Sequence, residues 1–186
     1  MTILSFLNSI EASKAGIESA NITSEMPMTI SRRHSPGSVI RYLVKAVARN
    51  GNLLLDVGPD ADGELDPQAV KILKEIGTWL KINGEAIYDT RPVKPYELGN
   101  VFFTGKTNGT VYAIVLSSQD GESMPSSVVL PASLTVNAKG ITLVGGDGTA
   151  LAFKSGHHQD TTEVSLPAAG AVQMPSTDAW CLKIVE

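Results

Sequence analysis

The chain has 186 residues and a hydrophobic content of 42%, enough to bury a core in one domain or in two small ones. Fifteen Lys and Arg against nineteen Asp and Glu give a net charge of -4 without any basic block, so the electrostatic footprint of a nucleic-acid-binding protein is missing. No apolar run reaches the roughly 20 residues that cross a bilayer, and the N-terminus lacks the features of a secretory signal. The sequence therefore predicts a soluble protein without a nucleic-acid or membrane partner, and it leaves the compartment open.

Helical spacing of apolar residues marks three segments in the first half of the chain. Residues 3–17 form the first, and a second amphipathic helix is predicted over residues 38–51, where basic side chains take the polar side. The best-specified helix starts after Asp66, which is expected to cap it, with Pro67 at its first position and Gly84 just past its end. Its predicted apolar side consists of Val70, Leu73, Ile76 and Leu80.

Between the second and third helical segments lies the run NLLLDVG, residues 52–58, which is apolar on both faces. This pattern predicts a short parallel strand covered by helices, as in an α/β barrel or a layered sheet. The acid-rich turn that follows does not match a calcium loop, because Gly63 comes too early and no closing Glu falls in place; a turn and a helix cap explain it instead. Asp56 differs from the other acids, since it lies at the C-terminal end of the predicted strand, where barrels place functional side chains. A hydrogen-bonded structural Asp fits the same position, and no metal site is predicted.

The pattern changes near Pro92 to Pro95, where we place a domain boundary between residues 1–93 and 94–186. Short β-rich runs with Gly, Pro, Asn and Asp between them then recur to the end of the chain, which indicates an antiparallel sandwich. The run at residues 111–116 is apolar on both faces and is expected at the centre of its sheet.

The closing run AWCLKIV is predicted as a strand in which Trp180, Leu182 and Ile184 share one face. It also contains the single cysteine of the chain, Cys181, which we interpret as a buried strand residue and not as a reactive thiol.

Several stretches resemble a known family. The run NGNLLLDVGPDADGELDPQAVKILKEIGTWLKINGEAIYDTRP resembles the end of the catalytic barrel in α-L-fucosidases of glycoside hydrolase family 29, which read Asn-x-Leu-Leu-Leu-Asn-Ile-Gly-Pro and then a helix ending in Trp-Leu-x-x-Asn-Gly-Glu-Ala-Ile-Tyr. Upstream, SEMPMTIS is similar to the family's Trp-Glu-x-x-Met-Thr-Ile segment. Downstream, TVYAIVLSS, ITLVGGDGTALAFK and the closing strand resemble its C-terminal β-sandwich.

The resemblance implies an α/β plus all-β fold, in which a partial (β/α) barrel segment is followed by an antiparallel β-sandwich. It also implies a retaining glycosidase for a fucosylated glycan or fucoside, without a cofactor, in which two carboxyl groups about 5 to 5.5 Å apart attack the anomeric carbon and protonate the leaving oxygen. Glu25 falls on the family's Trp-Glu position, which supplies the acid/base in some members, although Ser24 replaces the Trp; a plain surface glutamate is the alternative. Asp56 replaces the usual Asn and is a candidate second carboxylate.

The family's nucleophile and fucose-binding residues lie upstream, on earlier barrel strands, and this sequence begins after them, so a truncated form is expected. Residues 52–58 would then lack their barrel neighbours, and we expect a homo-oligomer to cover them, with residues 3–17 as a candidate contact. Three functions stay open: an α-L-fucosidase-like hydrolase, a non-catalytic carbohydrate-binding sandwich, and a structural or oligomerising remnant.

Overall fold

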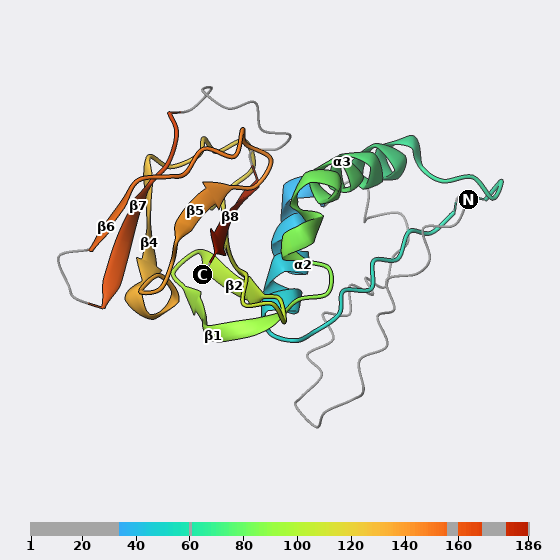
Figure 1. Ribbon diagram of the computed structural model, residues 1–186. Coiled ribbons are helices and arrows are strands. Elements are labelled where there is room, and N and C mark those ends of the chain that lie inside the picture. Colours follow the sequence, from blue (N-terminus) through green and yellow to red (C-terminus); the bar gives the residue numbers. More distant parts are fainter. Residues whose placement is uncertain (1–33, 60, 156–159, 169–177, 186) are drawn as a thin grey trace.

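The described residues build three layers from two helices and two antiparallel sheets (Figure 1). The computed structural model describes residues 34–59, 61–155, 160–168 and 178–185. Within these ranges the helical elements come first and an antiparallel β-sandwich follows, as the sequence predicts. The helical segment expected over residues 3–17 lies outside the described residues.

The two helices are α2 (Pro36–Ala48) and α3 (Pro67–Asn83), and a single 3-10 turn, η2 (Gly84–Ala86), continues α3. Ser35 caps α2 by accepting a hydrogen bond from the Ser38 amide at 3.0 Å. Asp66 caps α3 in the same way through the Gln68 amide at 2.7 Å, and Pro67 follows at the first helical position. The predicted caps of α3 are therefore confirmed.

The buried side of α3 is rotated from the predicted one. Of the four residues expected inside, Ile76 is buried, whereas Val70, Leu73 and Leu80 lie half-buried along the flanks of the helix. The side that faces the core carries Ala69, Ile72, Ile76, Trp79 and Asn83. The helix is rotated so that the large ring of Trp79 is fully buried. The spacing of apolar residues, on which the prediction relied, does not take the size of a side chain into account.

Residues 52–58 do not form the expected parallel strand. The segment alternates as a strand would, with Leu53 and Leu55 packed against the helical core and Leu54 and Asp56 exposed. None of the strands in the described part of the chain runs beside it, so the hydrogen-bond ladder that defines a parallel strand is not formed there. The prediction of a strand was wrong for that reason.

The described ranges contain eight strands. Their bounds are β1 (Arg91–Leu98), β2 (Val101–Gly105), β3 (Val111–Leu116), β4 (Ser127–Pro131), β5 (Gly140–Leu143), β6 (Phe153–Ser155), β7 (Thr161–Ser165) and β8 (Ala179–Val185), with a 3-10 turn, η3 (Ala132–Leu134), after β4. One sheet has the order β1-β2-β3-β8-β5 and the other the order β4-β7-β6, with every pairing antiparallel. The central place expected for residues 111–116 is confirmed.

The proline-rich stretch that we took as a boundary lies within β1. Pro92 and Pro95 are tolerated there because β1 is an edge strand, and its register with β2 shifts between Pro92 and Glu97. The sequence pattern thus hid two strands, β1 and β2, that precede the predicted ones.

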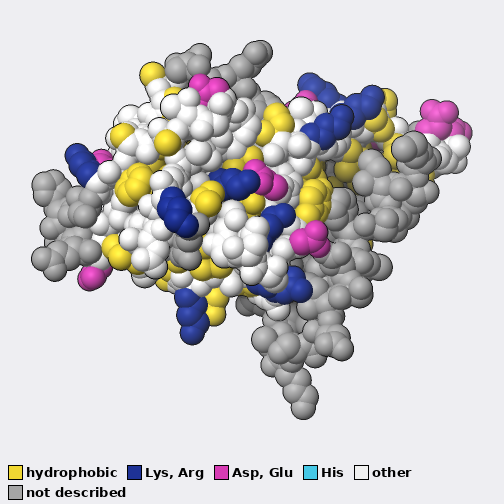
Figure 2. Space-filling model, in the orientation of Figure 1, with side chains coloured by type: hydrophobic (Ala, Val, Ile, Leu, Met, Phe, Trp, Pro, Cys, Tyr) yellow, Lys and Arg dark blue, Asp and Glu magenta, His cyan; other side chains and the backbone are white. Residues whose placement is uncertain are grey.

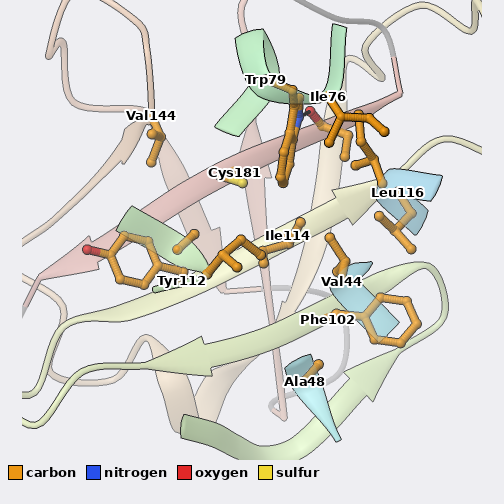
Figure 3. Close-up of a cluster of buried hydrophobic side chains, with 14 of the residues drawn as sticks. Val44, Ala48, Ile76, Trp79, Phe102, Tyr112, Ile114, Leu116, Val144 and Cys181 are labelled. Carbon is orange, nitrogen blue, oxygen red and sulfur yellow. Dashed lines mark hydrogen bonds between the residues drawn. The ribbon is translucent and has the colours of Figure 1, made fainter. Parts of the chain in front are cut away.

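The five-stranded sheet is apolar on both faces, and each face builds its own core. On β8, Trp180, Leu182 and Ile184 point toward the three-stranded sheet, as predicted from their alternation. Ala179 and Cys181 point the other way and pack with the helices (Figure 3). Burial raises the pKa of the Cys181 thiol, so this residue is the inert strand residue that the sequence predicts.

Trp79 is the side chain through which α3 enters the core over this sheet (Figure 3). The ring is fully buried, and its Nε1 donates a hydrogen bond to the carbonyl oxygen of Ala179 on β8 at 3.0 Å. Directly after α2, the guanidinium carbon of Arg49 lies 5.8 Å from the centre of the Phe102 ring on β2, and Arg49 forms an ion pair with Glu97 on β1 at 2.6 Å. Trp79 therefore joins α3 to β8, and Arg49 joins the end of α2 to β1 and β2.

Candidate functional site

The two carboxyl groups singled out by the sequence have different outcomes. Glu25 lies outside the described residues. Asp56 is exposed, in the extended segment between α2 and α3, while its neighbours Leu55 and Val57 turn inward and are half-buried. Retaining hydrolysis needs a pair of carboxyl groups across the glycosidic bond, and Asp56 by itself supplies one of the two.

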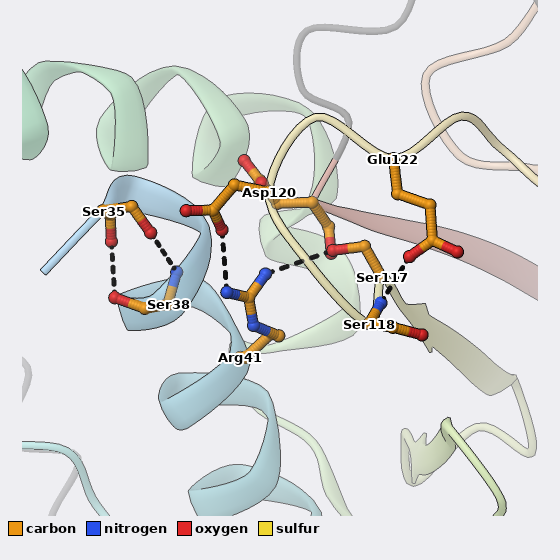
Figure 4. Close-up of polar contacts among 8 residues, drawn as sticks. Ser35, Ser38, Arg41, Ser117, Ser118, Asp120 and Glu122 are labelled. Atoms are coloured by element: carbon orange, nitrogen blue, oxygen red, sulfur yellow. Dashed lines mark hydrogen bonds and ion pairs between the residues drawn. The ribbon is translucent and has the colours of Figure 1, made fainter.

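A polar cluster fastens the start of α2 to the sandwich (Figure 4). Arg41 forms an ion pair with Asp120 at 2.7 Å and donates to the Ser117 hydroxyl at 3.2 Å. Ser117 in turn donates to the main-chain oxygen of Asp178 at 2.8 Å. A hydrogen bond with Ser35 and then the pair with Arg41 hold the pKa of Asp120 below its ordinary value, against the opposite effect of burial.

Gly37 shows how closely the parts of this cluster approach one another. A Cβ atom at this position in the first turn of α2 would collide with the carboxylates of both Asp120 and Asp178. Only glycine leaves room for the two side chains at the end of the helix. The cluster is therefore a tight junction between α2, the loop after β3 and the start of β8.

A second polar cluster fixes the end of α3. The Glu85 carboxylate on η2 accepts hydrogen bonds from the Tyr112 hydroxyl at 2.9 Å and from the Lys183 ammonium at 2.8 Å. Partial burial works to raise the pKa of Glu85, but the hydrogen bonds from Lys183 and Tyr112 outweigh it and hold the pKa below its ordinary value. Burial, and then the adjacent Glu85, raise the pKa of Tyr112. The carboxylate is thus held ionised between a phenol and an ammonium group, as in a structural ion pair.

Sequence reasoning found neither cluster. Arg41 and Asp120 are 79 positions apart, and Glu85 and Lys183 are 98 apart, so no local pattern connects them. Each residue also sits where an exposed charged residue would be expected from its own helix or strand. Only the folded arrangement of helices on the sheet brings the partners together.

Two hollows lie on the helical side of the described structure. One is an open depression of about 530 Å³ along the outer side of α3, and it is lined by Leu65, Pro67, Val70, Lys71, Lys74, Glu75 and Thr78. The other is a small hollow between both helices and the extended segment, lined by His34, Val39, Leu55, Val57, Ala69, Ile72 and Leu73. Neither set of described lining residues contains a pair of carboxyl groups.

Two further features of the described residues bear on binding chemistry. Across the ranges that the structure describes, no group of three or more His, Cys, Asp or Glu residues is placed to hold a metal ion. Neither α2 nor α3 is long and apolar enough to span a membrane.

Two family models match the chain in succession. The model described as alpha-L-fucosidase matches residues 23–85, and the model described as alpha-L-fucosidase C-terminal domain matches residues 96–185. The chain belongs to the α-L-fucosidase family. The first match contains both helices and the positions of Glu25 and Asp56, and the second contains nearly all of the sandwich.

Relatives and solved structures agree with this placement. The chain is 35% identical over 165 residues to the tissue alpha-L-fucosidase of Mus musculus, covering 86% of this chain and 34% of the mouse protein. It is 39% identical over 127 residues to the alpha-L-fucosidase of Dictyostelium discoideum, covering 67% and 24%. Alpha-L-fucosidase isoenzyme 1 from Paenibacillus thiaminolyticus superposes with a TM-score of 0.67 at 27% identity, covering 82% of this chain and 34% of that one.

The Thermotoga maritima alpha-fucosidase in complex with fucose is similar to this chain as well, with a TM-score of 0.66 at 27% identity. In each comparison the matched part of the relative is limited. The chain spans about a third of the length of the first curated relatives that it matches.

Proposed function

We propose that this chain is an α-L-fucosidase-like glycoside hydrolase segment, in which residues 1–93 supply closing elements of a catalytic barrel and residues 94–186 the C-terminal sandwich. The observation that carries the proposal is the succession of two fucosidase matches over the helices and the sandwich, which share one core. The substrate class is a fucosylated glycan or a fucoside. The mechanism is retaining double displacement, which forms and then hydrolyses a glycosyl-enzyme.

Glu25 is the proposed acid/base. It falls within the family match at residues 23–85, at the position of the family's Trp-Glu pair. In this role its carboxylic acid protonates the leaving oxygen in the first step, and its carboxylate then takes a proton from the attacking water. Asp56 is the proposed second carboxyl group, and its exposure leaves it open to a substrate or to a further part of the enzyme.

The test is the release of the aryl group from aryl α-L-fucosides by the purified 186-residue chain. If Glu25 is the acid/base, Glu25→Gln should lower turnover roughly 10² to 10⁴-fold for a poor leaving group and much less for an activated one. Asp56→Asn should lower turnover with both leaving groups. Glu163→Gln is the matched control, because it removes a carboxylate on β7 in the outer sheet.

Absence of turnover in the wild-type chain would show that these 186 residues are not active by themselves, and it would not affect the family assignment. Turnover that Glu25→Gln leaves unchanged with both leaving groups would remove Glu25 from the mechanism. An equal loss in the Glu163→Gln control would attribute the effects to folding and not to chemistry.

A structural, self-associating role is the second candidate function. It is favoured by the two hollows, whose described lining residues hold no carboxylate pair, and by the apolar side chains that remain exposed on the helical side, such as Leu54 and Leu65. A homo-oligomer is the proposed partner in this role. Sedimentation velocity over a hundredfold range of protein concentration tests it, and a constant monomer mass would contradict it.

A non-catalytic sugar-binding sandwich receives less support. The exposed aromatic side chains of the described residues, Tyr42, Tyr96 and Phe153, stand on α2, β1 and β6, so they do not form one stacking platform. Trp79 and Trp180 are both buried and would not report on a bound sugar. Isothermal titration with L-fucose is the appropriate measurement, and heat of binding would revive this alternative.

A further inference from the structure

The outer side of α3 combines an apolar centre with separated charges. Leu65, Pro67 and Val70 line the open depression of about 530 Å³ together with the lysines of the next turns. Leu65 is held in place by a backbone bridge to Pro59, and its side chain is 44% exposed. The open depression thus presents apolar side chains and lysines side by side on the outer surface of α3.

Acidic and basic side chains follow one another along this side of α3, with the acids Glu64 and Asp66 before the helix, then the lysines, and then Glu75, which pairs with Lys71. Exposed carboxylates, Glu64 and Asp66, lie at the N-terminal end, and exposed Lys71 and Lys74 follow within two turns. Figure 2 shows basic side chains over α3, acidic ones at the turn that precedes it, and apolar ones between them. Among the ion pairs found in the described residues, Lys71 reaches Glu75 at 3.9 Å, and Lys74 takes part in none.

The acids before the helix and Lys74 are complementary when one copy is turned end to end, while Glu75 stays paired with Lys71 of its own chain at 3.9 Å. A two-fold axis that passes near Val70 places Asp66 of one helix opposite Lys74 of the other, with Glu64 close by. At 1.5 Å per residue the acidic and basic ends are about 12 Å apart, so two such charge contacts would flank the apolar centre. A parallel arrangement would instead bring acids against acids and lysines against lysines.

We propose that the outer side of α3 is a self-association surface, on which a second copy of this chain packs its own α3 antiparallel about a two-fold axis near Val70. An interface of this type is isologous, so each contact is made twice and each substitution acts twice. The proposal deepens the self-association put forward above and rests on it, but it does not depend on hydrolase activity.

The first test measures mass by light scattering and sedimentation over a range of concentrations. The wild-type chain is expected at twice its mass of 19.6 kDa. Val70→Asp should yield a monomer, because it places two carboxylates face to face at the axis. Val136→Asp is the matched control, since Val136 is 75% exposed at the sandwich end of the molecule, and it should leave the dimer intact.

Charge exchange tests the orientation of the two copies. Lys74→Glu should weaken the dimer about tenfold or more, because an attraction becomes a repulsion at two symmetric places. The combination of Lys74→Glu with Glu64→Lys should restore much of the affinity, whereas Lys139→Glu on the sandwich should leave it unchanged. Far-UV circular dichroism of each variant shows whether the helices are retained.

A disulfide test uses a conservative substitution. The only native cysteine, Cys181, is fully buried, so a cysteine introduced at position 70 is the accessible thiol. Val70→Cys should form a disulfide-linked dimer under mild oxidation by diamide, and Val136→Cys should not.

A monomer at every concentration would overturn the self-association itself. A dimer that Val70→Asp and Lys74→Glu leave unchanged, or that Val70→Cys fails to cross-link, would overturn the α3 surface while leaving self-association in place. Neither result would bear on fucoside hydrolysis, which is measured separately.

Discussion

Replacing Trp79 by Ala should separate the stability of the helices from that of the sandwich. The indole is fully buried between α3 and the five-stranded sheet, and its Nε1 bonds to the Ala179 carbonyl at 3.0 Å. A buried aromatic side chain covers roughly 150–250 Å², which at about 25 cal/mol per Å² corresponds to about 4–6 kcal/mol. Since the remaining methyl group retains some contacts, we expect a loss of about 3–5 kcal/mol in the free energy of unfolding.

Two spectroscopic probes follow the two parts of the molecule in urea. The chain has two tryptophans, so in the Trp79→Ala variant the fluorescence comes from Trp180 alone, which lies between the sheets. Circular dichroism at 222 nm follows mainly the helices. We expect the helical signal to be lost at lower urea than the Trp180 signal.

Two companion variants sharpen the interpretation. Trp79→Phe retains most of the packing and loses the hydrogen bond, so it should cost about 1–3 kcal/mol with both transitions coincident. Leu130→Ala removes a fully buried side chain from the core between the two sheets. It should lower the urea midpoints of the circular dichroism and fluorescence transitions by the same amount. If Trp79→Ala unfolds in one transition at the wild-type midpoint, the reasoning about the shared core is refuted.

Two further predictions concern the ends of the helical layer. Partial burial works to raise the pKa of Glu85, but its hydrogen bonds, that from Lys183 foremost, outweigh burial and lower this pKa. The stabilising effect of Glu85 is therefore fully present above the ordinary pKa of a glutamate and is lost as the pH falls through the lowered value. The stability advantage of the wild type over Glu85→Gln should be measurable near neutral pH and should vanish in acid. Gly145 has a φ of 79° and its Cβ would strike the Ile82 side chain, whereas Gly148, at 82°, faces open space, so thermal melting should show a larger loss for Gly145→Ala than for Gly148→Ala, and equal losses would exclude the contact with Ile82.

The parts of the fold that depend on near neighbours in the sequence were predictable. Asp66 and Pro67 define the start of α3 because a cap and a first-turn proline act within three residues. The faces of β8 follow from strict alternation, which placed Trp180 and Cys181 in different cores. These signals need no knowledge of the rest of the chain.

The remaining features depend on partners far away in the sequence. Residues 52–58 have the composition of a strand, but a strand exists only where a neighbour supplies the hydrogen bonds. The rotation of α3 depends on the packing of Trp79 against β8, where its Nε1 bonds to the Ala179 carbonyl. The junction between Arg41 and Asp120 likewise joins residues that are 79 positions apart. For the candidate site, the pattern of residues 52–58 predicted Asp56 at a strand end, whereas it lies exposed in an extended segment.

The two family matches divide the chain between residues 85 and 96, yet the physical core crosses this division. Phe102, Ile114 and Leu116 lie on the sheet face that the helices cover, so a sandwich without the helices would expose that whole face to water. The polar junctions at Gly37 and Glu85 then fix one end of each helix against the same sheet. A five-stranded sheet with two apolar faces must be covered on both, and the helix pair, although it belongs to the first family match, is therefore also a layer of the sandwich.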